Sequence, residues 1–279
     1  MINCGYFYYN GELGKLSDAR IPLTDRAIYF AEAIYDVAIG QNGHVYQLKE
    51  HLERLLSNAK FVGLRCPEVS EIESAITSLI DMFGKGAFLL YLQLSGYGDL
   101  RDHSRRDESR SNLLVTVSQL SNPDPKSVAL NSETDLRHSI CNIKTTNLLC
   151  AVSSSVKASK TGFDETVYIR DGYVTECSHS NFLMIRDGAI YSHPADNKIL
   201  NGITKQNVER ICKNEGIPFY ESQFTLNEVI DSDGAVITST TKFLRVVSSI
   251  DSIRLKQSPL SDRIFDKLYS EYNKILFML

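Results

Sequence analysis

Residues 165–191, ETVYIRDGYVTECSHSNFLMIRDGAIY, hold the pattern that decides the fold class. Four short runs rich in apolar and β-branched residues are predicted as strands, at 165–170, 173–176, 181–185 and 189–191. Asp171-Gly172 and Asp187-Gly188 separate them in pairs, and Asp-Gly is a strong signal for a tight hairpin. Strands joined by tight hairpins run antiparallel, so the stretch predicts a largely antiparallel sheet rather than a doubly wound parallel one.

The rest of the chain continues this mixture of hairpins and helices. Asn10-Gly11 and Asn42-Gly43 predict two further hairpins. Apolar residues recurring at three and four predict amphipathic helices, and short apolar runs predict buried strands. The expected helices cover 48–62, 69–83, 145–159, 203–214 and 264–276, and the expected additional strands cover 87–94, 113–117, 128–130, 234–238 and 243–250. The predicted fold class is α+β.

A polar, proline-containing segment divides the chain. SNPDPK, residues 121–126, lies between two apolar runs, and its two prolines make it a stiff connector without a core of its own. We therefore predict an N-terminal domain over residues 1–119, an interdomain linker over 120–126 and a C-terminal domain over 127–279.

Charge and composition exclude several classes of protein. With 30 Lys and Arg against 34 Asp and Glu, the net charge of −4 gives no general attraction to nucleic acid or to anionic lipid. The longest apolar stretch, Ala87–Leu94, is far shorter than the ~20 residues of a membrane span. The six cysteines are scattered and form no CxxC pair, which argues against a zinc site and favours a reducing, cytoplasmic location.

Familiar catalytic motifs are absent, and four other short runs carry the chemical information. GxGxxG, GxxxxGK[ST], HExxH and GxSxG do not occur. In NIKTTNLL, Lys144 follows an apolar approach, so it is either a solvated lysine or a half-buried amine able to attack aldehydes. In VTECSHSN, Glu176 ends a strand before a polar turn, as a solvated connector residue or as a carboxylate held inward.

The other two runs are candidate anion sites. LNGITK leads into the helix predicted from Ile203, whose free backbone N–H groups favour an anion, although Thr204 is equally suited to cap that helix. ITSTT places three consecutive hydroxyl donors, including Thr240, after a buried strand. Each run alone is weak evidence for phosphate binding.

Taken together, these runs resemble the fold-type IV pyridoxal-phosphate (PLP) enzymes, which include D-amino-acid aminotransferases, branched-chain aminotransferases and aminodeoxychorismate lyases. The resemblance covers nearly the whole chain, and its segments occur in the family's order. They are DRAIYFAEAIYDV (25–37), HLERL (51–55), NIKTTNLL (142–149), VTECSHSN (174–181), YSHPADNKILNGITK (191–205) and ITSTT (237–241). It implies a smaller N-terminal α/β domain and a larger C-terminal pseudo-barrel domain, with PLP bound between them.

The resemblance also assigns a role to individual residues. Lys144 matches the catalytic Schiff-base lysine, and Glu176 matches the partner of the pyridine nitrogen. Ring-nitrogen protonation, which a buried carboxylate favours, is what makes PLP an electron sink. The remaining cofactor-binding residues are implied to be Arg54, Ile203, Thr204 and Thr240 around the phosphate and Leu200 against the ring, with no metal required.

Within the family, the charged loop after residue 94 is most like that of the D-amino-acid aminotransferases. Arg101 and His103 match an Arg-x-His pair that, with the tyrosine matching Tyr35, binds the substrate carboxylate in the partner subunit's active site. A solvated loop is the alternative reading of these charges. The resemblance thus implies a homodimer that transfers the amino group of a D-amino acid such as D-alanine to a 2-oxo acid such as 2-oxoglutarate, through a pyridoxamine form.

Several positions depart from the D-specific pattern, and other members of the family remain as rivals. Ala31-Glu32-Ala33 replaces Gly-Asp-Gly, Cys177 replaces a glycine, and His138 and Ile140 replace Trp and Arg. Arg137 is retained, either near the substrate or at the surface. A branched-chain L-aminotransferase would leave Arg101 and His103 unexplained. An aminodeoxychorismate lyase would share Lys144 and Glu176. A non-enzymatic cofactor-binding protein would not need to retain both Lys144 and Glu176.

Overall fold

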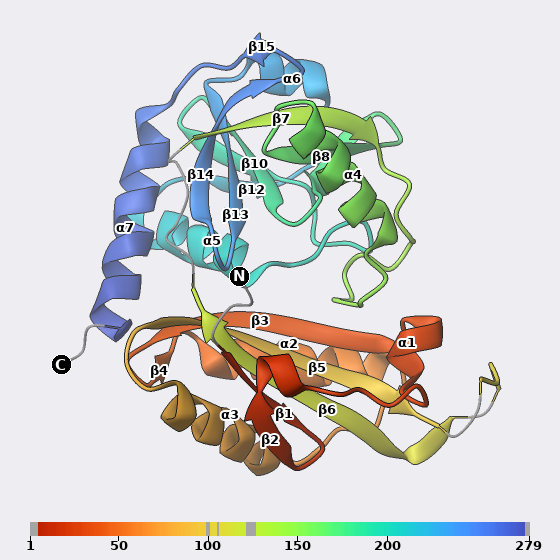
Figure 1. Cartoon of the computed structure of the whole chain (residues 1–279). Coiled ribbons are helices and arrows are strands. Elements are labelled where there is room, and N and C mark those ends of the chain that lie inside the picture. The colour runs from red at the N-terminus through yellow and green to blue at the C-terminus, as the bar shows by residue number, and fades with distance from the viewer. Residues whose placement is uncertain (1–4, 99–100, 105, 121–126, 277–279) are drawn as a thin grey trace. The chain divides into compact units, whose positions relative to one another are not determined.

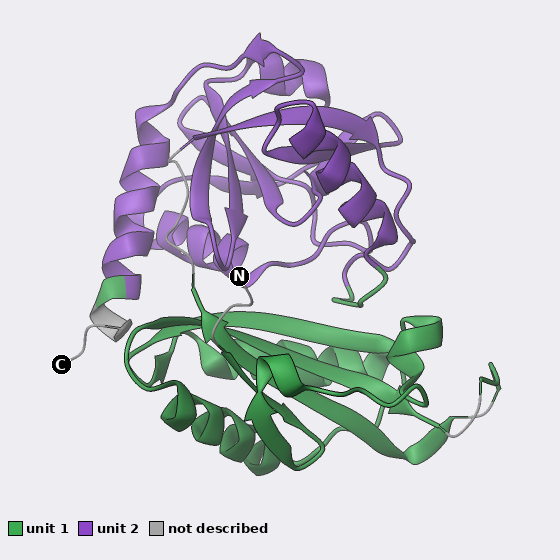
Figure 2. Cartoon of the chain, viewed as in Figure 1, with its two compact units in different colours: residues 1–122, 143–147, 273–279 green, residues 123–142, 148–272 purple. Residues whose placement is uncertain are grey.

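The structure, a computed structural model, describes residues 5–98, 101–104, 106–120 and 127–276. The chain divides into two compact units, coloured separately in Figure 2. Unit 1 contains residues 1–122, 143–147 and 273–279, and unit 2 contains residues 123–142 and 148–272. Residues 121–126 of the predicted linker lie outside the described residues, so the linker stays a prediction.

Unit 1 is an antiparallel sheet with two amphipathic helices packed on it (Figure 1). The strand order is β2-β1-β6-β5-β3-β4, and every neighbouring pair is antiparallel. Its elements are β1 (Gly5–Tyr9), β2 (Glu12–Lys15), the 3₁₀ turn η1 (Leu16–Asp18), α1 (Arg26–Phe30), β3 (Ala33–Gln41), β4 (His44–Val45), α2 (Leu48–Phe61), α3 (Val69–Phe83), β5 (Ala87–Tyr97) and β6 (Asp107–Gln119).

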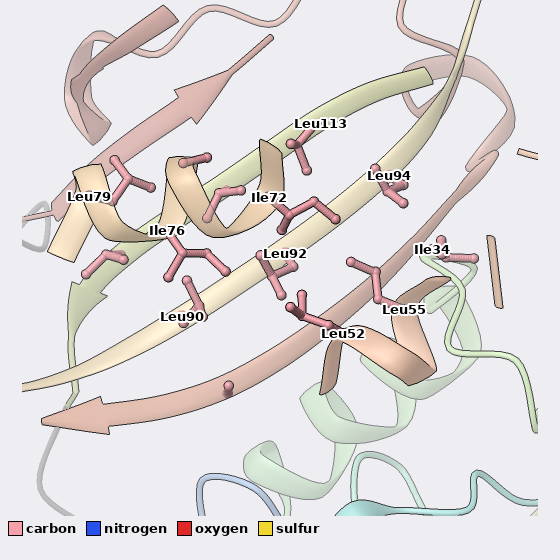
Figure 3. Close-up of a cluster of buried hydrophobic side chains, with 14 of the residues drawn as sticks. Ile34, Leu52, Leu55, Ile72, Ile76, Leu79, Leu90, Leu92, Leu94 and Leu113 are labelled. Carbon is pink, nitrogen blue, oxygen red and sulfur yellow. The ribbon is translucent and has the colours of Figure 1, made fainter. Parts of the chain in front are cut away.

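The core of unit 1 explains why α2 and α3 form where the apolar spacing predicted them. Leu52 and Leu55 on α2 and Ile72, Ile76 and Leu79 on α3 recur on one face of each helix, and all are buried. Figure 3 shows these side chains pointing onto the apolar face of the sheet. Burying a leucine or isoleucine stabilises a fold by about 1.5–3 kcal/mol, so this face holds both helices in place.

Unit 2 contains a nine-stranded sheet covered by helices. The strand order is β12-β11-β10-β13-β14-β7-β8-β9, with β15 paired to β14. Its elements are β7 (Ser127–Thr134), α4 (Leu149–Lys160), β8 (Glu165–Arg170), β9 (Tyr173–Cys177), β10 (Asn181–Arg186), β11 (Ala189–Ser192), α5 (Ile203–Glu215), β12 (Phe219–Glu221), α6 (Leu226–Asp231), β13 (Gly234–Ser239), β14 (Phe243–Ile250), β15 (Ile253–Arg254) and α7 (Pro259–Leu276), whose residues from Asn273 are grouped with unit 1.

The sheet of unit 2 closes on itself. Strand β9, last in the order, also pairs with β10, through Glu176 opposite Asn181. Strands β10, β13, β14, β7, β8 and β9 therefore form a ring, the pseudo-barrel expected from the resemblance. Most pairs are antiparallel as predicted, but β14–β7, β7–β8 and β11–β12 are parallel.

The hairpin and helix signals are confirmed, and several predicted boundaries were wrong, among them the start of the last helix, which begins at Pro259 rather than at residue 264. Both residues of each predicted Asn-Gly and Asp-Gly turn have positive φ, as tight hairpins require. The helix expected at 145–159 begins only at Leu149, because Thr145 instead pairs with Ile34 of β3. The charged loop expected after residue 94 is shorter, since Tyr97 and Asp107 still pair across β5 and β6.

Candidate active site

Lys144 lies in unit 1, on a short segment hydrogen-bonded along β3. Its carbonyl accepts a 2.9 Å bond from the Tyr35 amide, and Thr146 donates its amide to Ala33. The Lys144 Nζ lies 4.5 Å from the centre of the Tyr35 ring, and that ring stacks on Tyr91. The structure thus brings two sequence-predicted residues, the candidate Schiff-base lysine and the candidate substrate-binding tyrosine, directly together.

Arg54, the candidate phosphate ligand, is fixed by a buried carboxylate. Its Nε and Nη2 donate to Asp36 at 2.7 and 2.8 Å, and His51 Nδ1 lies 2.7 Å from the same carboxylate. Among the described residues no bond from Nη1 is found, so this donor remains for an anion. Burial alone would raise the pKa of Asp36, but Arg54 and then His51 outweigh it and hold the pKa well below its usual range.

We expect Asp36→Asn to lower the free energy of unfolding by about 3–5 kcal/mol at pH 7, because it leaves the Arg54 charge buried without its partner. The depressed pKa of Asp36 gives stability that is present above pH ~4 and is lost as pH falls toward the folded-state pKa. The difference between variant and wild type should therefore shrink in acid. Urea unfolding at pH 7 and below pH 4 measures both effects.

Glu53→Gln is the matched control, because Glu53 forms an exposed ion pair with Lys49 on the same helix. Such a pair contributes about 1 kcal/mol at most. An Asp36 variant that loses no more than this control would contradict the buried-pair interpretation.

Arg101 and His103 lie over the aromatic residues of α1. The Arg101 guanidinium is 5.5 Å from the centre of the Phe30 ring, and the His103 ring is 4.9 Å from the same ring. Arg26 secures this loop by donating to the Asp102 carbonyl at 2.7 Å. The two residues thus share one described surface of unit 1.

Of the departures at residues 31–33, only Glu32 has contacts that account for it. Ala31 adopts φ +48°, a left-handed conformation that glycine accepts at lower cost. Glu32 forms ion pairs with Arg26 and Arg106, so it braces the base of the 101–103 loop.

Glu176, the candidate partner of the ring nitrogen, is buried in unit 2 and held from three sides. Arg137 Nη1 donates to one oxygen at 2.5 Å, while the Asn181 side chain and the Leu200 amide donate to the other at 3.0 Å each. The structure thus brings Glu176 and Leu200 together. It also corrects the surface alternative for Arg137, whose side chain is only 11% exposed.

A second carboxylate completes this arrangement. Asp135 accepts from Arg137 Nε and Nη2 at 2.9 Å each, and Arg170 lies 2.9 Å from the same carboxylate. Burial alone would lower the pKa of Arg137, but its bonds to Asp135 and the charge of Glu176 raise it. The Glu176 carboxylate is therefore fixed beside a permanent cation.

The start of α5 provides the candidate phosphate site predicted around Ile203 and Thr204. Gly202 precedes the helix and offers no side-chain cap, so the first backbone N–H groups are available to an anion. A Cβ atom at Gly202 would lie 2.1 Å from the Asn181 side-chain oxygen, so only glycine fits. Thr240 follows β13, whose Thr238 is the register partner of Asn181.

Three features here escaped sequence reasoning. His193 is fully buried, and burial lowers its pKa. Arg137 was named from the sequence, but its pairing with Glu176 was not predicted, because the two residues lie 39 positions apart. An ion pair between Glu165 and Lys242, at 3.0 Å, was not predicted either.

Comparison with known proteins places this chain in a family. The sequence model of the family "Amino-transferase class IV" matches residues 33–250. A D-alanine aminotransferase from Listeria monocytogenes serotype 4b is 30% identical over 272 residues, covering 94% of each chain. The chain therefore belongs to the class IV aminotransferases, which are PLP enzymes.

Solved structures show the same fold. A branched-chain aminotransferase from Thermoproteus uzoniensis superimposes with a TM-score of 0.87 at 22% identity, covering 97% of this chain and 94% of that one. An aminotransferase from Brucella abortus bound to PLP gives a TM-score of 0.87 at 19% identity, covering 96% and 99%. The fold is thus the two-domain α+β fold of fold-type IV.

The residues present fit PLP. A carboxylate paired with Arg137 suits a protonated pyridine nitrogen, and an uncapped helix start beside hydroxyl groups suits a phosphate. None of the helices in the described residues combines the length and apolar character needed to cross a bilayer.

Proposed function

We propose that the chain is a D-amino-acid aminotransferase, which transfers the amino group of a D-amino acid such as D-alanine to a 2-oxo acid such as 2-oxoglutarate. The buried Glu176–Arg137–Asp135 arrangement is the observation that carries the PLP chemistry. The Arg101-x-His103 pair and the similarity to D-alanine aminotransferases support the D-specific assignment.

Each site residue has a distinct task in this proposal. Bound PLP supplies an electron sink for the bond at the substrate Cα. Glu176 keeps the ring nitrogen protonated, and Leu200 packs against the ring. Lys144 holds the cofactor aldehyde and then moves a proton to and from Cα. The phosphate is anchored by Arg54, Ile203, Thr204 and Thr240.

The substrate carboxylate is assigned to Tyr35, Arg101 and His103. A guanidinium binds a carboxylate through two parallel hydrogen bonds, which fixes the side from which Cα–H meets the lysine. We further propose that Arg101 and His103 serve the site of a second copy, so that the enzyme is a homodimer. The cysteine pattern supports a cytoplasmic location.

The test compares substrates on the PLP-loaded enzyme. D-alanine should change the absorbance of the bound cofactor and release pyruvate, and L-leucine should not. A response to L-leucine alone would instead favour a branched-chain aminotransferase, the class of the Thermoproteus structure. Pyruvate release from aminodeoxychorismate would favour a lyase.

Arg101→Ala should raise KM for D-alanine by about 10–100-fold while the cofactor absorbance is unchanged, because a charge-assisted hydrogen bond to the carboxylate is lost. Steady-state kinetics measure this effect. Arg110→Ala is the control, since Arg110 is exposed near the same loop and stacks on Tyr97. An unchanged KM in Arg101→Ala would remove this residue from the site.

A further inference from the structure

Two polar turns meet at one edge of the unit 2 sheet. Residues 178–180 connect β9 to β10 and begin two positions after Glu176, and residues 240–242 connect β13 to β14 and include Thr240. Asn181 and Thr238 are register partners, so both turns leave the same end of neighbouring strands. The turns therefore lie beside the two groups assigned to the cofactor, the ring-nitrogen carboxylate and the phosphate hydroxyl.

Glu165 forms hydrogen bonds with both turns. Its carboxylate is fully buried and accepts the His179 amide at 2.8 Å, the Ser180 hydroxyl at 3.0 Å and the Lys242 ammonium at 3.0 Å. A buried carboxylate bound in this way fixes the positions of its donors. Lys242 is thereby held as a pre-positioned cation rather than as a mobile surface lysine.

Lys242 also contacts the imidazole of His179. The Lys242 Nζ lies 3.0 Å from His179 Nε2, and His179 Nδ1 lies 3.0 Å from the Ser178 hydroxyl and 3.3 Å from Glu165. Because an ammonium only donates, Nε2 is the acceptor and the ring proton sits on Nδ1. Of the two side chains, Lys242 is 23% exposed and His179 is 48% exposed, so both reach the surface of the unit.

The charges of this cluster suit an incoming carboxylate. Glu165 balances Lys242, and its contacts with Glu165 and His179 engage two of the three ammonium donors. A second carboxylate beside Lys242 would accept a charge-assisted hydrogen bond from the third ammonium donor, while His179 Nε2 keeps accepting from the same ammonium. A neutral or apolar group would gain none of these interactions.

We propose that Lys242 binds the distal carboxylate of a dicarboxylic substrate, and that Glu165 and His179 are the positioning residues that hold its ammonium. This rests on the proposed function, because in PLP the phosphate arm and the reacting carbon are attached to adjacent ring atoms. We place the far end of the substrate beside the turn of residues 240–242, because Lys242 lies two positions beyond Thr240 in it. The subsite would select acidic amino acids and 2-oxo dicarboxylic acids over their monocarboxylic analogues.

The test is a comparison of amino acceptors, with D-alanine as donor and the amino acid product measured by chromatography. Lys242→Met should lower kcat/KM for 2-oxoglutarate by about 10–100-fold and change that for 2-oxobutyrate by less than about threefold. Lys242→Arg should recover part of the loss, because it keeps the charge. Lys256→Met, at an exposed lysine of the same unit, is the control for removing a surface charge.

A binding measurement independent of turnover accompanies the kinetics. Calorimetry of glutarate and butyrate on the protein with and without PLP should show a preference for glutarate that Lys242→Met and His179→Gln reduce. Equal losses for both acceptors, or an unchanged glutarate preference, would overturn the subsite and leave Lys242 as a brace between the turns. Failure of the wild-type protein to use any D-amino acid would refute the proposed function, whereas the glutarate preference would still decide this inference.

Discussion

Lys144→Ala should reduce transamination by at least about a thousandfold. Removing the amine eliminates both the group that holds the cofactor aldehyde and the base that moves the Cα proton, and positioned proton transfer alone contributes about 10²–10⁴-fold. The cofactor should still bind, because the contacts assigned to its phosphate and ring nitrogen are untouched. Turnover of D-alanine and cofactor absorbance measure these two effects.

Borohydride reduction supplies a chemical check on the same residue. In the wild-type enzyme, reduction followed by peptide mapping should locate the cofactor on residue 144, and in the variant it should not. Lys60→Ala, at an exposed lysine of the same unit, should behave as wild type. Cofactor trapped on any other lysine would refute the assignment of Lys144.

Arg137→Met should lower the free energy of unfolding by about 3–5 kcal/mol. It leaves the carboxylates of Asp135 and Glu176 buried without their shared cation. Burial raises the pKa of Asp135 and the bonds from Arg137 lower it, so the variant should also bind a proton at Asp135 more readily. Urea unfolding measures the loss of stability.

Arg210→Met is the matched control for this change. Arg210 pairs with Glu271 at the surface, where an ion pair contributes about 1 kcal/mol at most. A loss in Arg137→Met no larger than in this control would show that the Glu176 carboxylate does not depend on Arg137.

Much of the fold could be predicted because its signals are local. The Asp-Gly and Asn-Gly turns, and the helices at 48–61 and 69–83, follow from residues within a few positions of one another. The helix start near residue 145 was wrong because pairing with Ile34, more than a hundred positions away, overrides the local pattern. The closed ring of strands also requires the pairings β10–β13 and β14–β7, whose partners lie far apart in the sequence, and no short pattern encodes them.

In the candidate site, too, some residues could be predicted from local patterns and others could not. Lys144, Glu176 and the α5 start could be proposed from short motifs, and the structure places Lys144 beside Tyr35 and Glu176 beside Leu200. Their supporting groups could not be proposed so easily. Asp36, Arg137 and Glu165 act through ion pairs across 18, 39 and 77 positions, and such distances leave no periodic trace in a sequence.

The pairing of β9 with β10, which closes the ring of strands in unit 2, has one more consequence. Glu176 and Asn181 form the pair at which the ring closes, and the same two side chains bind each other. A local opening that breaks this pair would also move the Glu176 carboxylate away from the position assigned to the pyridine nitrogen. The closure of the ring of strands and the proposed activity therefore depend on the same pair of residues.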